Sequence, residues 1–89
     1  MYLHVGQEIL VREKDILGIF DLDNTTVAKM TREFLGAAEK RGDVITTTPE
    51  LPKSFILCHD GENTKIYLTQ ISAGTLKKRW NYVKELSNL

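Results

Sequence analysis

The sequence predicts a small α+β domain in which short, mostly antiparallel strands are combined with two helices. Brief runs of β-type residues alternate with turn signals along most of the chain. Two longer segments instead repeat apolar residues at the spacing of a helix. In chain order these patterns predict the succession β-β-β-α-β-β-β-α.

A chain of 89 residues suits one domain with a modest core, because a domain of this size buries only about 60% of the surface that its unfolded chain exposes. Its 42% apolar and 27% charged residues are typical of a soluble globular protein. No apolar run approaches the roughly 20 residues of a membrane helix, and the N-terminus lacks the features of a signal peptide. The single cysteine, Cys58, cannot form an internal disulfide. We therefore expect a cytoplasmic protein without a membrane partner.

Three short strands are predicted in the N-terminal part. Tyr2–Val5 alternates weakly in polarity and is followed by a glycine turn. Glu8–Arg12 is the second strand, and a charged turn follows it. Ile16–Asp21 is apolar on both faces apart from its end, which predicts a central strand that is covered on both sides.

The first helix is predicted to begin near Asn24 or Thr25, since either side chain can cap free backbone amides. Its last turn is predicted to contain Lys40 and Arg41, with Gly42 at the position after the helix. Gly36 lies inside this helix and indicates close packing against another backbone. The apolar stripe that we expect to lie on the sheet consists of Val27, Met30, Phe34, Ala37 and Ala38.

The second half of the chain contains the clearest hairpin. Val44–Thr47 is a short β-rich run, and two prolines make residues 48–52 a loop or a sheet edge. The hairpin joins Ser54–His59 to Thr64–Gln70 through an Asp-Gly turn. Ser72 then caps a last helix, which has apolar residues at helical spacing. We expect the helices to cover one face of the sheet, and self-association to cover the remaining face or an edge.

The end of the third strand carries the sequence DLDNT, which is similar to the start of the phosphatase-type hydrolases of the haloacid dehalogenase superfamily. Under that hypothesis Asp21 would attack a phosphoryl group, Asp23 would act as general acid and base, and Mg²⁺ would bind beside them. Such an enzyme also needs a positioned lysine, further acidic ligands and a parallel sheet, which a short chain with tight hairpins does not supply. We therefore interpret the segment as a polar loop with a helix cap, and we expect no catalytic residues, metal, cofactor or small-molecule substrate.

Two other residue pairs also fail as sites of chemistry. Cys58 and His59 are neighbours on a strand, so their side chains point to opposite faces and cannot form a nucleophile and base pair. A buried structural thiol is the expected role of Cys58. His4 is distant in sequence, and two histidines without further ligands do not predict a metal site.

Charge is balanced over the whole chain but unevenly distributed, with twelve basic and twelve acidic residues in all. Residues 72–89 contain four basic side chains and one acidic side chain, so an anion-binding surface is expected to involve this segment. Lys77, Lys78 and Arg79 are consecutive and fan round about 200° of a helix. On one helix such a run is usually a solvated surface. Repeated in a symmetric oligomer, it would add phosphate contacts from each subunit.

Five segments carry a resemblance to a known family: HVG (His4 to Gly6), DILGIFDLD (Asp15 to Asp23), EKRG (Glu39 to Gly42), ELPKSFIL (Glu50 to Leu57) and ISAGTLKKR (Ile71 to Arg79). Together they resemble the extracellular matrix regulatory proteins of Gram-positive bacteria (RemA/RemB), and within that family the B type, RemB. The resemblance runs over nearly the whole of residues 1–80. Residues 81–89 lie outside it and are expected to form a C-terminal helix extension.

The resemblance implies ring-like homo-oligomers and, for the A type, activation of biofilm matrix gene transcription by direct DNA binding. The A type has an arginine just before the third strand and an arginine pair before the fifth. The matching positions here are Asp15 and, for the pair, Leu51 and Pro52, and a carboxylate repels phosphate groups. We therefore expect DNA contacts from other cations, namely Lys53, Lys77, Lys78 and Arg79.

The sequence thus favours a non-enzymatic, oligomeric regulatory protein that binds DNA through repeated basic surfaces. A second hypothesis is an assembly or adaptor protein without a nucleic-acid role, whose oligomer surface or Trp80-bearing helix meets a protein partner. The magnesium-dependent phosphatase is the third hypothesis.

Overall fold

The computed structural model describes residues 1–23 and 28–87, which form the α+β fold that the sequence predicts. The predicted order of elements is confirmed, with one short 3-10 helix added at Glu13–Asp15. The strands are β1 (Tyr2–Gly6), β2 (Ile9–Arg12), β3 (Ile16–Asp21), β4 (Val44–Thr46), β5 (Ser54–His59) and β6 (Thr64–Thr69), and the helices are α1 (Ala28–Lys40) and α2 (Ala73–Ser87). The predicted caps Asn24 and Thr25 and the stripe residue Val27 lie outside the described residues.

The strands form a two-stranded sheet of β1 and β2 and a four-stranded sheet in the order β3-β5-β6-β4. Neighbouring strands are antiparallel except β4 and β6, which run parallel. The predicted β5-β6 hairpin is confirmed. Its turn is closed by Asp60, whose Oδ1 accepts hydrogen bonds from the backbone N–H groups of Glu62 (2.9 Å) and Asn63 (2.8 Å).

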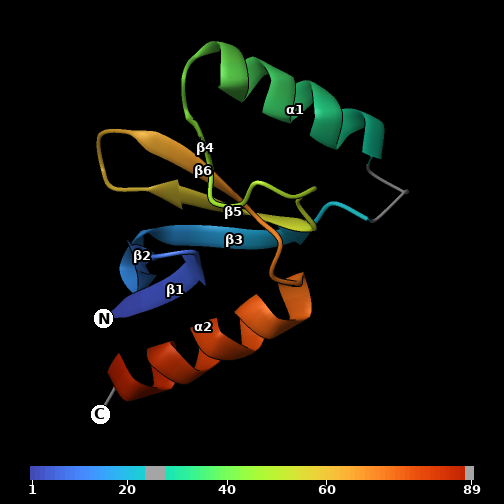
Figure 1. Ribbon diagram of the computed structural model, residues 1–89. Coiled ribbons are helices and arrows are strands. Elements are labelled where there is room, and N and C mark those ends of the chain that lie inside the picture. Colours follow the sequence, from blue (N-terminus) through green and yellow to red (C-terminus); the bar gives the residue numbers. More distant parts are fainter. Residues whose placement is uncertain (24–27, 88–89) are drawn as a thin grey trace.

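The two helices lie on opposite faces of the four-stranded sheet (Figure 1), so the expectation that they share one face is wrong. Successive side chains on a strand point to opposite faces. On β5, Ile56 and Cys58 pack with α2, whereas Phe55 and Leu57 belong to the cluster on the α1 side. Because β5 is apolar on both faces, each face needs its own cover.

The α2 side holds a closed hydrophobic core. Its buried residues come from both sheets and from α2, and they are Leu3, Val5, Val11, Ile16, Ile19, Ile56, Cys58, Ala73 and Leu76. Trp80 and Val83 of α2 pack against this cluster, as their helical spacing predicts. The predicted cap is also confirmed, since the Ser72 Oγ accepts a hydrogen bond from the backbone N–H of Thr75 (3.2 Å).

The α1 side is covered less completely, and the predicted stripe on α1 packs on the sheet only in part. Ala38 is fully buried, but Met30 is 73% exposed and Phe34 is 41% exposed. Ala37 is exposed as well. The prediction of close backbone packing at Gly36 is wrong, because a Cβ atom built there would have no heavy atom within 4 Å.

Strand β3 is an edge strand, so the prediction of a central, covered strand is also wrong. Strand β3 is apolar because its side chains pack on both faces of the sheet, although it lies at the edge. Ile16 and Ile19 fill the core on the α2 side, whereas Phe20 stacks on Phe55 on the α1 side with 4.9 Å between ring centroids. Leu17 lies at an irregularity of the β3-β5 pairing and is 63% exposed. An edge of this kind leaves backbone hydrogen-bonding groups and apolar surface available to another chain.

Candidate nucleic-acid interface

Lys77, Lys78 and Arg79 are consecutive in sequence, but helix α2 directs their side chains to different sides. All three side chains are exposed. Arg79 turns toward the β1-β2 hairpin, where its Nη1 donates a hydrogen bond to the carbonyl of His4 (3.3 Å). Within residues 1–23 and 28–87, neither Lys77 nor Lys78 forms an ion pair. Arg79 therefore braces α2 against the hairpin, and the two lysines remain available to an anion.

A fourth cation, Lys84, lies on the same side of α2 as Lys77, because seven residues complete almost two helical turns. Its ammonium lies 4.1 Å from the centroid of the Trp80 ring, a cation–π contact that orients the side chain. Lys84 is not among the predicted DNA contacts. The i, i+7 spacing from Lys77 is the sequence signal that identifies it.

Lys53 lies near the start of α2. Its backbone N–H donates to the carbonyl of Thr69 (2.9 Å), and its carbonyl accepts from the N–H of Leu22 (2.9 Å). These bonds fix Lys53 between the end of β6 and the end of β3, and its side chain is exposed. Since Thr69 precedes the α2 cap Ser72 by three residues, Lys53 and the first turns of α2 belong to the same end of the molecule.

The positions that correspond to the A-type arginines are occupied here by an ion pair and by apolar residues. Arg12 donates to both carboxylate oxygens of Asp15, from Nε (2.8 Å) and from Nη2 (3.0 Å). The hydrogen bond and the charge of Asp15 raise the pKa of the Arg12 guanidinium above its ordinary value. Leu51 is 89% exposed, and Pro52 is half-buried. This part of the surface therefore offers phosphate groups little net positive charge.

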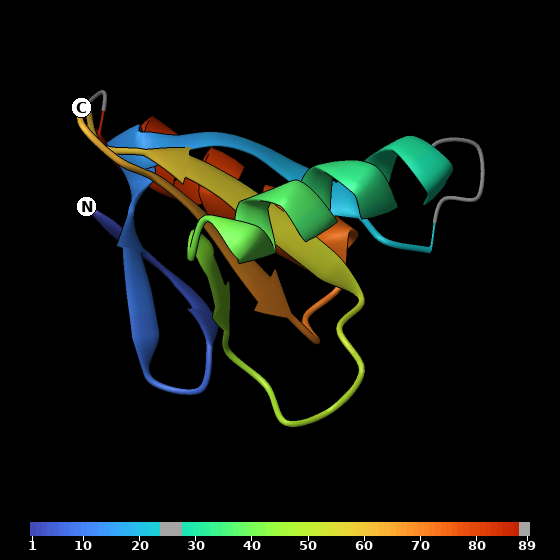
Figure 2. The same cartoon turned by 90° about the horizontal axis from the view of Figure 1, so that it is seen from above.

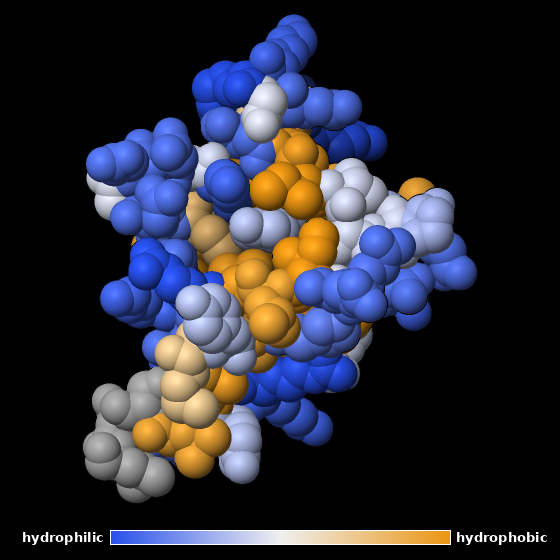
Figure 3. Space-filling view, turned by 60° about the vertical axis from the view of Figure 1, so that its left-hand side comes forward, coloured by the Kyte–Doolittle hydropathy of each residue, from blue (hydrophilic) through white to orange (hydrophobic). Residues whose placement is uncertain are grey.

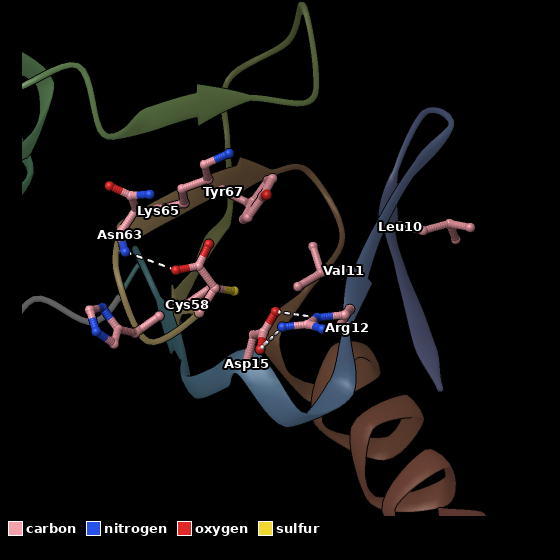
Figure 4. Close-up of a pocket in the computed structure, with 10 residues that line it drawn as sticks. Leu10, Val11, Arg12, Asp15, Cys58, Asn63, Lys65 and Tyr67 are labelled. Atoms are coloured by element: carbon pink, nitrogen blue, oxygen red, sulfur yellow. Dashed lines mark hydrogen bonds and ion pairs between the residues drawn. The ribbon is translucent and has the colours of Figure 1, made fainter.

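Asp15 also lines a polar pocket of about 190 Å³ beside the β5-β6 hairpin (Figure 4). Cys58, Lys65 and Tyr67 reach the pocket from the two strands of the hairpin. Burial, and secondarily the charge of Asp15, raises the pKa of the Cys58 thiol to about 12. Burial likewise raises the pKa of Tyr67. The pocket therefore holds a protonated thiol, which is a poor nucleophile at neutral pH.

Cys58 and His59, which are adjacent on β5, have different surroundings although both line the polar pocket. Cys58 is 4% exposed and belongs to the core on the α2 side, whereas His59 is exposed. The His59 Nδ1 instead lies 3.1 Å from the Thr64 hydroxyl across the hairpin. The other histidine, His4, is exposed and contacts the carbonyl of Gln7 through Nε2.

The DLDNT segment is described as far as Asp23. The Asp21 carboxylate accepts a hydrogen bond from the backbone N–H of Asp23 (2.7 Å), which closes a local turn after β3. The parallel sheet that the hydrolase hypothesis needs does not form in the described residues, where only β4 and β6 pair in parallel. In the same ranges no three His, Cys, Asp or Glu side chains are grouped so as to hold a metal ion.

In the described part of the chain, neither α1 nor α2 combines the length and the apolar composition that crossing a bilayer requires.

Comparison with known proteins points to the same family as the five segments quoted above. The family described as RemA-like, Extracellular matrix regulatory protein A-like, matches residues 2–80. The chain is 31% identical over 88 residues to Extracellular matrix regulatory protein B of Bacillus subtilis (strain 168), an alignment that covers 99% of this chain and 100% of that relative. The match includes every described strand, α1 and the first half of α2. The chain therefore belongs to the RemA-like family of extracellular matrix regulatory proteins.

Proposed function

We propose that this protein is a non-enzymatic, cytoplasmic regulator of biofilm matrix genes that binds DNA as a ring-like homo-oligomer. Its family membership supports the regulatory role. The observation that carries the DNA-binding part is the group of exposed cations around the start of α2, formed by Lys53, Lys77 and Lys78. Arg79 and Lys84 flank this group and add to its positive field.

Helix α2 adds its dipole to these side chains. The helix has 15 residues, and its N-terminal end carries a partial positive charge. Ser72, Gly74 and Thr75 are exposed there, so a phosphate group can approach this end of the helix. Few cations are involved, however, and each neutralised phosphate adds only one increment to the affinity. A single subunit would therefore bind DNA weakly.

Self-association would repeat this basic end along one duplex and raise the affinity through effective concentration. Apolar surface supports such an assembly. In Figure 3 a band of hydrophobic surface runs from beneath α1 toward the C-terminal end of α2, between hydrophilic flanks. The exposed large hydrophobic residues of the described ranges include Leu10, Leu17 and Leu51, which are 59%, 63% and 89% exposed. Contiguous apolar surface of this kind is typical of protein interfaces.

An electrophoretic mobility-shift series across salt concentration tests the DNA-binding role. We expect retention of duplex DNA at low salt and its release as salt rises from about 50 to about 200 mM. The double variant Lys77→Glu, Lys78→Glu should lose retention. The matched control is Lys14→Glu, Lys65→Glu, which changes the net charge equally at two exposed lysines outside α2 and should lose much less. Absence of binding at low salt, or equal losses in the two double variants, would exclude this interface.

Sedimentation with and without duplex DNA separates this function from that of an adaptor protein without a nucleic-acid role. The proposed regulator sediments faster when DNA is added at low salt. An adaptor would self-associate but would sediment at the same rate with and without DNA. Arg79 is left unchanged in these experiments because it also holds the β1-β2 hairpin.

A further inference from the structure

An apolar groove lies open between α1 and the β3 side of the sheet. Its volume is about 410 Å³, and its lining consists of Phe20, Met30, Thr31, Phe34, Phe55 and Leu57. The Phe20 ring stacks on Phe55, and the Phe34 ring lies 6.3 Å from Phe55 between centroids. Met30 is 73% exposed. The groove is therefore an aromatic site bordered by a flexible side chain that can adapt to an occupant.

An exposed loop that carries an apolar side chain lies on the opposite side of the molecule from the groove. The loop of residues 47–53, between β4 and β5, stands out on the side away from β3 in Figure 2. Leu51, in the second half of this loop, is 89% exposed, more than the other exposed large hydrophobic residues of the described ranges. Prolines at positions 49 and 52 restrict the backbone on both sides of Leu51. The Thr48 hydroxyl also accepts a hydrogen bond from the N–H of Glu50 (3.1 Å), which stiffens the loop.

The loop and the groove agree in size. An apolar cavity of about 150 Å³ takes up a benzene molecule. The groove, at about 410 Å³, therefore has room for the Leu51 side chain together with part of the flanking prolines.

The charge next to Leu51 is opposite in sign to two of the charges beside the groove. The part of α1 that borders the groove carries Lys29, Arg32 and Glu33, a net charge of +1. The loop of residues 47–53 carries Glu50 and Lys53, a net charge of zero, and Glu50 is the charged residue directly next to Leu51. Within the described ranges none of these charged side chains has an ion-pair partner. Glu50, Lys29 and Arg32 are all exposed, so an ion pair between Glu50 and either cation would help to fix the orientation of the loop at the groove.

We propose that Leu51 of one subunit inserts into the groove formed by Phe20, Met30 and Phe34 of a second copy of this chain. This inference rests on the self-association in the proposed function and identifies its interface. Since the loop and the groove lie on opposite sides of a subunit, each added copy leaves one free loop and one free groove. Such a head-to-tail contact closes into a ring when the rotation between neighbouring copies permits it.

Sedimentation velocity of the full chain across protein concentration tests the interface. Leu51→Asp removes the apolar side chain of the loop and Met30→Asp blocks the groove, and both positions are exposed enough that we expect folding to be retained. Each substitution should raise the dissociation constant of self-association by about tenfold or more, the loss typical of a central interface residue. Tyr82→Asp, at an α2 position that is 64% exposed, is the matched control and should leave self-association unchanged.

Mixing the two variants gives a sharper test. The Leu51→Asp chain keeps its groove and the Met30→Asp chain keeps its loop, so the mixture should form dimers through one intact contact and nothing larger. The wild-type chain should form larger species. Circular dichroism of each variant checks that folding is retained, and a variant that fails to fold is replaced by Leu51→Ser or Met30→Ser.

The outcomes separate this inference from the proposed function. A wild-type oligomer that persists in both folded variants would overturn the Leu51 interface and leave the regulatory oligomer standing. That result would also be expected if the groove received a segment of a different protein. A wild-type chain that stays monomeric at every concentration would overturn both the interface and the oligomeric function.

Discussion

The two faces of the four-stranded sheet present similar apolar side chains but are covered to different extents. On the α2 face, the β1-β2 hairpin and α2 together close a buried cluster around Ile56. On the α1 face, the buried cluster consists of Ala38, Phe55 and Ile66, while Met30 remains mostly exposed. Two elements pack on one face and a single helix packs on the other. The α2 face therefore contributes most of the buried core, whereas the α1 face leaves apolar surface exposed.

The sequence of α1 explains why this helix leaves part of its face uncovered. Its C-terminal half contains the small residue Ala38, which permits close approach to the sheet and is fully buried. The turn that follows holds this end, because the N–H of Asp43 donates to the carbonyl of Ala38 (3.0 Å). Its N-terminal half carries the bulky Met30 and Phe34, which line the groove. The helix is therefore anchored at one end and open at the other.

Truncating one apolar side chain on each face should give the largest contrast. Leu76→Ala removes a fully buried side chain from the α2 core and should lower the free energy of unfolding by about 3 kcal/mol. Met30→Ala should lower it by less than about 0.5 kcal/mol, because the side chain is mostly exposed. Urea unfolding followed by circular dichroism at low protein concentration measures both values. Equal losses would contradict the distinction between a closed face and an open face.

Replacing either of two glycines by alanine should change the stability of the fold, but in opposite directions. Gly6 has a φ of +140°, and a Cβ atom there would lie 2.5 Å from the Thr47 Oγ1, so Gly6→Ala should destabilise the fold by about 2 kcal/mol. Gly36 faces open space inside α1, so Gly36→Ala should stabilise it by about 1 kcal/mol. Thermal and urea unfolding of the two variants provide the test. A destabilising Gly36→Ala would mean that α1 packs more tightly than this comparison requires.

Because the Cys58 thiol is buried on the α2 face, the free energy of unfolding should depend on pH. Burial raises its folded-state pKa to about 12 from an ordinary value of 9.0. Above about pH 9 the unfolded chain loses the thiol proton while the folded chain keeps it, so the free energy of unfolding falls as pH rises. Below about pH 9 both states keep the proton and the contribution of the thiol is constant.

Cys58→Val is the matched variant for this effect, because it removes the ionisable group and keeps an apolar side chain of similar size. Between pH 8 and pH 10 the wild type should lose roughly 1 kcal/mol more stability than the variant, since one pKa unit corresponds to about 1.4 kcal/mol. Urea unfolding at the two pH values measures the difference. Identical pH dependence would indicate that water reaches the thiol and that this face is less closed than its burial implies.

Several features of the candidate site were predictable because they depend on nearby residues. The Ser72 cap follows from local sequence, and the exposure of Lys77 and Lys78 follows from their places on a helix whose apolar spacing identifies its buried side. The hydrogen bond from Arg79 to the carbonyl of His4 was not predictable in the same way, because the two residues are 75 positions apart in the chain. The exposure of Leu51 also lay outside sequence reasoning, since an apolar residue between two prolines does not show from sequence alone whether it is buried.

The sequence by itself determined the order of strands and helices, the β5-β6 hairpin, the burial of the Cys58 thiol and the family. These features depend on spacing, turn residues and local hydrogen bonds, all of which a linear sequence contains. The tertiary structure decided that the helices lie on opposite faces, that β3 is an edge strand and that Met30 borders an open groove. Those features depend on contacts between residues far apart in the chain, and an apolar pattern identifies a face to be covered without identifying what covers it.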